Sequence, residues 1–200
     1  DRYLGDPSRD NLHVNGDTHQ FTLDHDLGQG WRTRVGASYR ETDLYGEAVD
    51  LTGTLQADGR TLTRRDSWRS LPARDTSVQA EVEGKLQTGG LRHTVLAGVE
   101  SWRLYMGQDI RYSTLASQPF AIDIHNPTYG QAPGNLTPGF DTRDRQRATG
   151  LFVQDQMDLS ERWKLLAGVR FDRYHQDYEN RLASTVQTQS HSAATPRVGV

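Results

Sequence analysis

Apolar and polar side chains alternate residue by residue over long runs of this sequence. Successive side chains of a β-strand point to opposite faces, so a two-residue period predicts strands with one apolar and one polar face. No useful stretch shows helical periodicity, and no window approaches the ~18 consecutive apolar residues of a membrane-spanning helix. The chain is therefore predicted to be all-β. The clearest apolar set is Trp163, Leu165, Ala167, Val169 and Phe171.

Short turns and long loops divide the alternating runs. Short turns at one end of the strands and long loops at the other are typical of bacterial transmembrane barrels. The short turns are predicted at Gly28-Gln29-Gly30, Thr88-Gly89-Gly90 and Ser160-Glu161-Arg162. Long outer loops are predicted near 46–73, 108–142 and 180–191. About seven antiparallel strands are predicted between them, at 17–27, 31–45, 74–87, 91–106, 144–159, 163–178 and 192–200.

The composition fits a barrel and excludes several other classes. Mean hydropathy is −0.78, which a barrel tolerates because half of its strand residues are polar. The net charge of −3 gives no case for a nucleic-acid surface. The chain has no cysteine, so disulfides, thiol catalysis and cysteine-ligated metals are excluded.

Aromatic spacing favours a membrane over a soluble barrel. Trp31 and Tyr39 lie eight residues apart on one apolar face, as do Trp163 and Phe171, which is roughly 26 Å of strand. A tilt of about 40° projects this to roughly 20 Å, close to the ~25 Å apolar band of outer-membrane barrels. These four residues are predicted to form the aromatic girdle. A soluble β-sandwich or lipocalin-like barrel gives the same alternation and stays the alternative.

The opposite, polar face is predicted to line the barrel lumen. Its members carry charges of both signs, as expected of a hydrated interior. The predicted lumen-facing residues are Arg32, Arg34, Arg40, Arg92, Glu100, Lys164, Arg170 and Asp172.

Residues 150–159, reading Gly-Leu-Phe-Val-Gln-Asp-Gln-Met-Asp-Leu, and residues 163–172, reading Trp-Lys-Leu-Leu-Ala-Gly-Val-Arg-Phe-Asp, closely resemble the barrel of TonB-dependent ferric-siderophore receptors. Residues 195–199 resemble a strand start of the same family, and residues 2–6, 93–100 and 122–130 are similar to its hydroxamate, or ferrichrome-type, members. The resemblance covers essentially the whole chain.

The resemblance implies a 22-stranded barrel in the outer membrane of a Gram-negative bacterium, closed by an N-terminal plug. Residues 1–200 would be an internal part of one such barrel domain, with the plug domain absent from this sequence. The implied function is uptake of iron-siderophore complexes. The implied partners are the ferric siderophore, outer-membrane lipid and, through the plug, the TonB-ExbB-ExbD energy-transducing complex.

Aromatic residues on the outer side are the candidates for ligand binding, because outer aromatics commonly line the siderophore pocket of this family. The alternative is that each aromatic side chain packs against its own loop or belongs to the aromatic girdle. The candidates are Trp102, Tyr105, Tyr112, Phe120, Tyr129 and Phe140.

The sequence gives little support for a metal site or for an enzyme. His19 and His25 share a strand face but lie some 20 Å apart, too far to share one ion. No His-Glu-x-x-His or Gly-x-Ser-x-Gly motif is present. No catalytic residue, metal site or cofactor is therefore predicted, and iron would enter already chelated. Uptake of haem (with His125 or His191), cobalamin or a sugar, or a non-transport binding barrel, remain alternatives.

Overall fold

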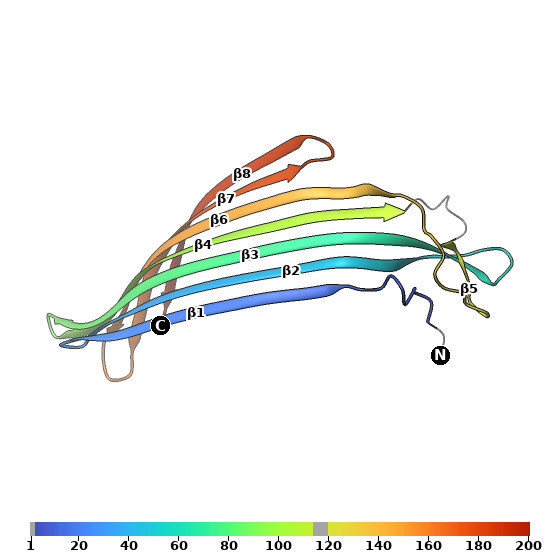
Figure 1. Ribbon diagram of the computed structural model, residues 1–200. Helices are drawn as coiled ribbons and strands as arrows, with labels where there is room; N and C mark the ends of the chain where they lie inside the picture. The colour runs from blue at the N-terminus through green and yellow to red at the C-terminus, as the bar shows by residue number, and fades with distance from the viewer. Residues whose placement is uncertain (1–2, 114–119) are drawn as a thin grey trace.

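The computed structural model describes residues 3–113 and 120–200, and these form one antiparallel sheet (Figure 1). Along the sheet the strands follow the order β1-β2-β3-β4-β6-β7-β8, and the two-residue β5 pairs with β3. The predicted all-β fold and its seven long strands are confirmed. The bounds are β1 His13–Gly28, β2 Trp31–Leu55, β3 Thr61–Thr88, β4 Leu91–Ser113, β5 Ile122–Asp123, β6 Leu136–Asp158, β7 Lys164–Asn180 and β8 Thr185–Gly199.

The strands run further outward than predicted, so the predicted loop bounds are wrong. The loop predicted at 46–73 narrows to 56–60, and that predicted at 180–191 narrows to 181–184. The two ends of the loop predicted at 108–142 belong to strands, because β4 continues to Ser113 and β6 begins at Leu136. Residues 114–119 of this loop lie outside the described part of the chain. Strand pairing needs only backbone hydrogen bonds, so strands continue where polar side chains on both faces hide the alternation.

Three tight turns close one end of the sheet, as predicted. Gly28, Gln29 and Gly30 all have positive φ, at 81°, 54° and 83°, a conformation that glycine adopts without strain. In the third turn the Ser160 hydroxyl accepts hydrogen bonds from the backbone N–H groups of Arg162 and Trp163. Trp163 itself precedes β7 and was wrongly predicted as its first residue, because the turn uses its backbone.

The strand register joins the apolar sets into one continuous face. A row across five strands holds only apolar side chains: Val35, Ala80, Val99, Leu151 and Phe171. Leu151 is 54% exposed and Phe171 is 48% exposed, and among the described residues only Ile110, Phe120 and Ile122 form a buried apolar core. No layer formed by the described residues covers this apolar face, as is typical of a barrel wall in contact with lipid. The sheet is therefore one section of a transmembrane barrel wall.

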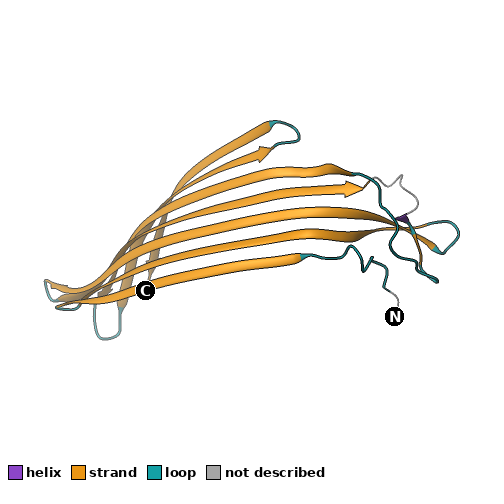
Figure 2. Cartoon of the chain, viewed as in Figure 1, coloured by secondary structure: helices purple, strands orange, loops and turns teal. Residues whose placement is uncertain are grey.

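The wall curves and twists along its length, with loops and turns confined to its two ends (Figure 2). The tight turns gather at one end, and the N-terminal segment, β5 and the 56–60 loop gather at the other (Figure 1). Short turns face the periplasm in bacterial barrels, so the second end is called the outer end here.

Val153 tests which face meets lipid. Val153→Arg is expected to destabilise the full-length barrel by about 2–4 kcal/mol, the cost of a cationic side chain on the lipid face near the bilayer midplane. Gln154→Arg, on the next residue and the polar face, is the matched control and is expected to cost less than about 1 kcal/mol. Unfolding in denaturant from lipid vesicles measures both. Equal costs would contradict the face assignment.

Gly168 tests the close packing of β6 and β7. A Cβ at this position would lie 2.9 Å from the Val153 carbonyl oxygen, a backbone atom that cannot move aside. Gly168→Val is therefore expected to destabilise the barrel by about 1–3 kcal/mol. Gly199→Val is the control, because a Cβ there meets ordinary contacts at 3.8 Å or more. Heat-modifiable electrophoretic migration reports the result, and equal melting of the two variants would contradict it.

Candidate functional site

The polar face carries ion pairs that link neighbouring strands. Arg32 Nη2 lies 2.9 Å from Glu83 Oε2, its direct register partner on β3. Arg34 Nε donates to Asp24 Oδ1 at 2.6 Å, linking β2 to β1. The side chains are substantially exposed, so each pair stabilises the fold by only ~0–1 kcal/mol. Their main effect is to hold long side chains upright on this face.

A second group of ion pairs lies across β4, β6 and β7. Arg170 Nη2 contacts Glu100 at 2.8 Å and Asp172 at 2.9 Å. Gly150 leaves the space for this cluster, since a Cβ there would lie 2.3 Å from Arg170 Nη2. Nearer the turns, Asp158 contacts both Arg92 and Lys164 at 3.3 Å. Strand alternation puts all eight predicted lumen-facing residues, including Arg40, on the polar face.

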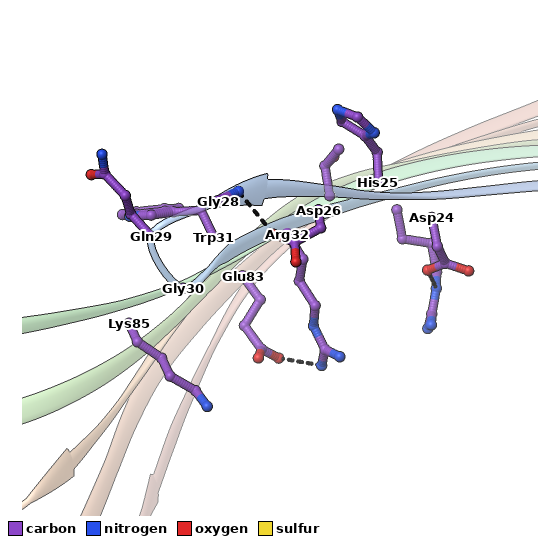
Figure 3. A pocket seen from close by; sticks show the side chains of 12 residues that line it. Asp24, His25, Asp26, Gly28, Gln29, Gly30, Trp31, Arg32, Glu83 and Lys85 are labelled. Carbon is purple, nitrogen blue, oxygen red and sulfur yellow. Dashed lines mark hydrogen bonds and ion pairs between the residues drawn. The ribbon is translucent and has the colours of Figure 1, made fainter.

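A hollow of about 610 Å³ lies at the tight-turn end (Figure 3). Arg32, Glu83 and Lys85 point to one side of the sheet there, and His25 points to the other. The lining holds charged side chains of both signs beside the Trp31 ring, and the hollow is open to solvent. This hollow is better suited to contact with a polar protein surface than to small-molecule binding.

Trp102, one of the predicted ligand-binding residues, lies on the polar face of β4. Its ring centroid is 6.3 Å from that of Tyr174, at an interplanar angle of 49°. The pair spans β4 and β7, with the small Ala148 of β6 between them in register. Sequence reasoning missed Tyr174 as a site residue, although it alternates with Arg170 and Asp172 on the same face.

Tyr105 lies on the opposite face from Trp102, because it is three positions further along the same strand and successive side chains alternate. It pairs in register with Arg74 and Arg145, and Arg145 lies 6.0 Å from its ring centroid. The structure therefore does not bring Tyr105 into the Trp102–Tyr174 group.

Tyr112 and Phe140 meet at the outer end. Their rings pack edge to face with centroids 6.4 Å apart, and the Arg65 guanidinium lies 3.7 Å from the Tyr112 ring centroid. The Tyr112 ring covers Gly139, where a Cβ would lie 2.4 Å away. Phe140 remains 48% exposed, so this pair offers an aromatic surface above the wall.

Phe120 and Tyr129 belong to a small packed unit that we call the outer-end cluster, residues 3–10, 64–67 and 120–131. Phe120 is completely buried, and its carbonyl accepts a hydrogen bond from Arg64 Nε at 2.9 Å. The Arg64 guanidinium also lies 4.6 Å from the Phe120 ring centroid. The Tyr129 hydroxyl donates to the Tyr3 carbonyl at 2.7 Å. Phe120 thus forms core and presents no surface to a ligand, contrary to its predicted role.

Two buried carboxyls hold the outer-end cluster together. Burial by itself would raise the pKa of Asp6, but hydrogen bonds from Ser8 and from the Gly130 N–H outweigh it and leave this pKa below its ordinary value. Burial raises the pKa of Asp66, and the charge of Arg9 at 3.0 Å opposes this only in part. Asp6 therefore ties the N-terminal segment to the loop after β5.

The predicted girdle residues meet the exterior in different ways. Trp31 covers Gly84 on the apolar face, where a Cβ would lie 2.2 Å from its ring, and Trp163 is 64% exposed. The Tyr39 hydroxyl donates to Glu41 at 2.6 Å. Phe171 aligns in register with Val35 and not with Tyr39. Their role as a girdle stays a prediction.

In residues 3–113 and 120–200, no three histidine, aspartate or glutamate side chains gather closely enough to hold a metal ion. No helix in these ranges is long and apolar enough to cross a membrane.

The fold and the two-faced wall define an antiparallel transmembrane barrel, and sequence comparison gives its family. The family model described as "TonB dependent receptor-like, beta-barrel" matches residues 1–200. The chain therefore belongs to the TonB-dependent receptor β-barrel family, whose members are outer-membrane β-barrels.

Several relatives are named as receptors and none as an enzyme. The chain is 37% identical, over its full length and 29% of the relative, to the metal-pseudopaline receptor CntO of Pseudomonas aeruginosa (strain UCBPP-PA14). It is 26% identical over 76% of its length to the ferrioxamine B receptor of Salmonella typhimurium (strain LT2), covering 21% of that protein. The chain thus spans less than a third of these relatives.

Solved structures share the fold. The ferric-catecholate import receptor Fiu of Escherichia coli K12, in its closed form, superimposes with a TM-score of 0.72 at 19% identity, covering 98% of this chain and 31% of that one. The unliganded ferric citrate transporter FecA gives 0.71 at 16% identity, covering 96% and 25%.

Asp6→Ala is expected to loosen the outer-end cluster by about 1–3 kcal/mol, because it leaves the Gly130 N–H without its acceptor. Hydrogen exchange should then speed up in residues 3–10 and 120–131 but not in the strands of the wall. Asp17→Ala, at an exposed position of β1, is the control. The pKa of Asp6 is lower in the folded protein than its ordinary value. The stability that Asp6 contributes is therefore fully present at pH values above the ordinary pKa and is lost as the pH falls through the folded-state pKa. Unchanged exchange in both segments would contradict this role.

Proposed function

We propose that the full-length protein is an outer-membrane receptor that takes up iron-siderophore complexes in a TonB-dependent manner. The observation that carries the proposal is the two-faced wall, with an exposed apolar exterior and an ion-paired polar interior that presents the Trp102–Tyr174 aromatic pair. Membership of the TonB-dependent receptor family and the names of the relatives support it.

In this proposal, residues of the inner wall and the outer end capture the chelate. Aromatic rings offer a large apolar contact with a polar tip, which suits an organic chelator wrapped around a metal. The charged side chains near Glu100 and Arg170 keep the interior hydrated and provide hydrogen-bonding groups along the path. The metal arrives with its coordination shell filled, so the protein needs no ligand of its own for it.

The energy for passage would come from the TonB-ExbB-ExbD complex acting on a plug domain. Paired charges such as Arg32 and Glu83, at the hollow near the tight turns, would face that plug. The proposed location is the outer membrane of a Gram-negative cell, with the strands of this chain as part of the multi-pass barrel.

A metal chelate other than a ferric siderophore is the second candidate. The relative that is 37% identical over the whole chain is named as a receptor for metal-pseudopaline. The cargo is therefore either a ferric hydroxamate, the ligand type that the sequence resemblance implies, or another metal-chelator complex. Haem and cobalamin remain the further alternatives.

Trp102 and Tyr174 test the capture site. Trp102→Ala and Tyr174→Ala in the full-length receptor are each expected to weaken chelate binding about tenfold, the usual loss at a central aromatic contact. Tyr45→Ala is the control. This tyrosine is 38% exposed and lies on the same apolar face as Tyr39, opposite to the face that carries Trp102 and Tyr174. Quenching of tryptophan fluorescence on chelate addition measures affinity. Unchanged affinity in both inner-face variants would contradict the site.

Uptake of radiolabelled metal identifies the cargo. Cells whose own receptors are deleted would express the full-length protein and receive a ferric hydroxamate, a ferric catecholate, metal-loaded pseudopaline or haem. TonB-dependent uptake of a ferric siderophore is the expected result. Uptake of metal-pseudopaline alone would favour the second candidate, and uptake of haem alone would overturn both.

A further inference from the structure

Three arginines form a cationic group on the lipid side of the wall. Arg103 of β4 pairs directly in register with Arg147 of β6, and Arg173 of β7 lies one position diagonally from Arg147. Arg103 alternates with Val99 on its strand, so the group shares the exposed apolar face and not the lumen face. We call these three residues the arginine group.

The arginine group lacks the counter-charges that arginines have on the other face. Arg32, Arg34 and Arg170 all contact carboxylates there. None of the three arginines of the group has an ion pair or hydrogen bond to any residue in 3–113 or 120–200.

The register makes this arrangement costly for the protein alone. Arg103 and Arg147 lie directly opposite each other, and like charges in this position on adjacent strands are destabilising. Asp177, the carboxylate nearby on the same face, already accepts hydrogen bonds from His175 and Thr188. Asp177 also attracts Arg147 through its charge, which offsets part of the repulsion. An external anion would offset the part that remains.

The surface is hollowed where these side chains meet. One hollow of about 390 Å³ is lined by Arg103, Arg147 and Arg173, together with Ser101 and Thr149. A second, of about 480 Å³, continues outward past Arg103 and Arg147. Guanidinium groups and hydroxyls are the donors that phosphate oxygens bind best.

The depth of the group matches the level of lipid headgroups. Arg173 is two residues beyond Phe171, the outermost apolar residue of its strand face, which is roughly 7 Å. Arg103 is four residues beyond Val99, roughly 13 Å. Both lie on the side away from the tight turns, so the group stands at the outer edge of the apolar band, in the outer leaflet.

We propose that Arg103, Arg147 and Arg173 bind the phosphate groups of a lipid in the outer leaflet, whose acyl chains lie along Val99, Leu151 and Phe171. Charge complementarity and continuity with the exposed apolar band select a phosphorylated lipid over a soluble anion or a protein. The proposal rests on the outer-membrane location in the proposed function and is independent of which chelate is carried.

Native mass spectrometry of the detergent-solubilised full-length receptor tests the proposal. The probes are bisphosphorylated lipid A and its dephosphorylated form, which has the same acyl chains. Wild-type receptor is expected to bind the phosphorylated probe more tightly. Combined Arg103→Gln, Arg147→Gln and Arg173→Gln substitution is expected to weaken this binding about a hundredfold, at roughly fivefold per arginine near an anionic lipid surface.

Arg147→Gln and Arg197→Gln form the matched pair of single variants. Arg197 lies on the polar face of β8, so its loss changes the net charge equally but should leave lipid binding unchanged. Equal binding by wild type and the triple variant, equal binding of the two lipids, or equal weakening by Arg147→Gln and Arg197→Gln would each overturn the proposal. Displacement of the lipid by inorganic phosphate alone would also overturn it, because the site would then be one for soluble anions. This measurement does not involve chelate uptake. A failure of chelate uptake would therefore refute only the proposed transport function and not the lipid site.

Discussion

A single-layer sheet with an exposed apolar face is the constraint on which the rest of this structure depends. Val99, Leu151 and Phe171 align across strands, and no layer formed by residues 3–113 or 120–200 covers them. In water such a face would cause aggregation, whereas in a bilayer its apolar side chains contact the acyl chains of the lipid. The membrane thus takes the place of the second layer that a soluble sheet would need, and the described part of the chain buries only three apolar side chains.

The same constraint separates two kinds of charge. On the polar face, arginines contact carboxylates on neighbouring strands, as Arg170 contacts Glu100, and the charges compensate one another within the protein. On the apolar face, Arg103 and Arg147 lie opposite each other, and neither forms an ion pair within 4.0 Å of a carboxylate among the described residues, although Asp177 lies near Arg147. Compensated charge suits a hydrated passage for a chelate, whereas uncompensated charge at the edge of an apolar band suits an anionic headgroup.

Prediction from sequence succeeded where one face is apolar and failed above that band. The strands around Val35, Val99 and Val169 were found because a two-residue period is visible whenever alternate residues must avoid water. The outward extensions of β2, β3 and β8 were missed, since residues such as Thr185 and Thr188 pair through the backbone with polar side chains on both faces. Tight turns were found because glycine marks positive φ.

The sequence by itself determined which side of its own strand each residue occupies, because alternation is a local property of the backbone. It therefore assigned Arg170 to the polar face and Phe171 to the apolar face. Only the tertiary structure decided which residues of different strands meet, such as Tyr174 with Trp102 or Arg147 with Arg103. Register between strands depends on turn geometry and on the whole ladder of hydrogen bonds, and burial such as that of Phe120 beneath Arg64 depends on segments far apart in the chain.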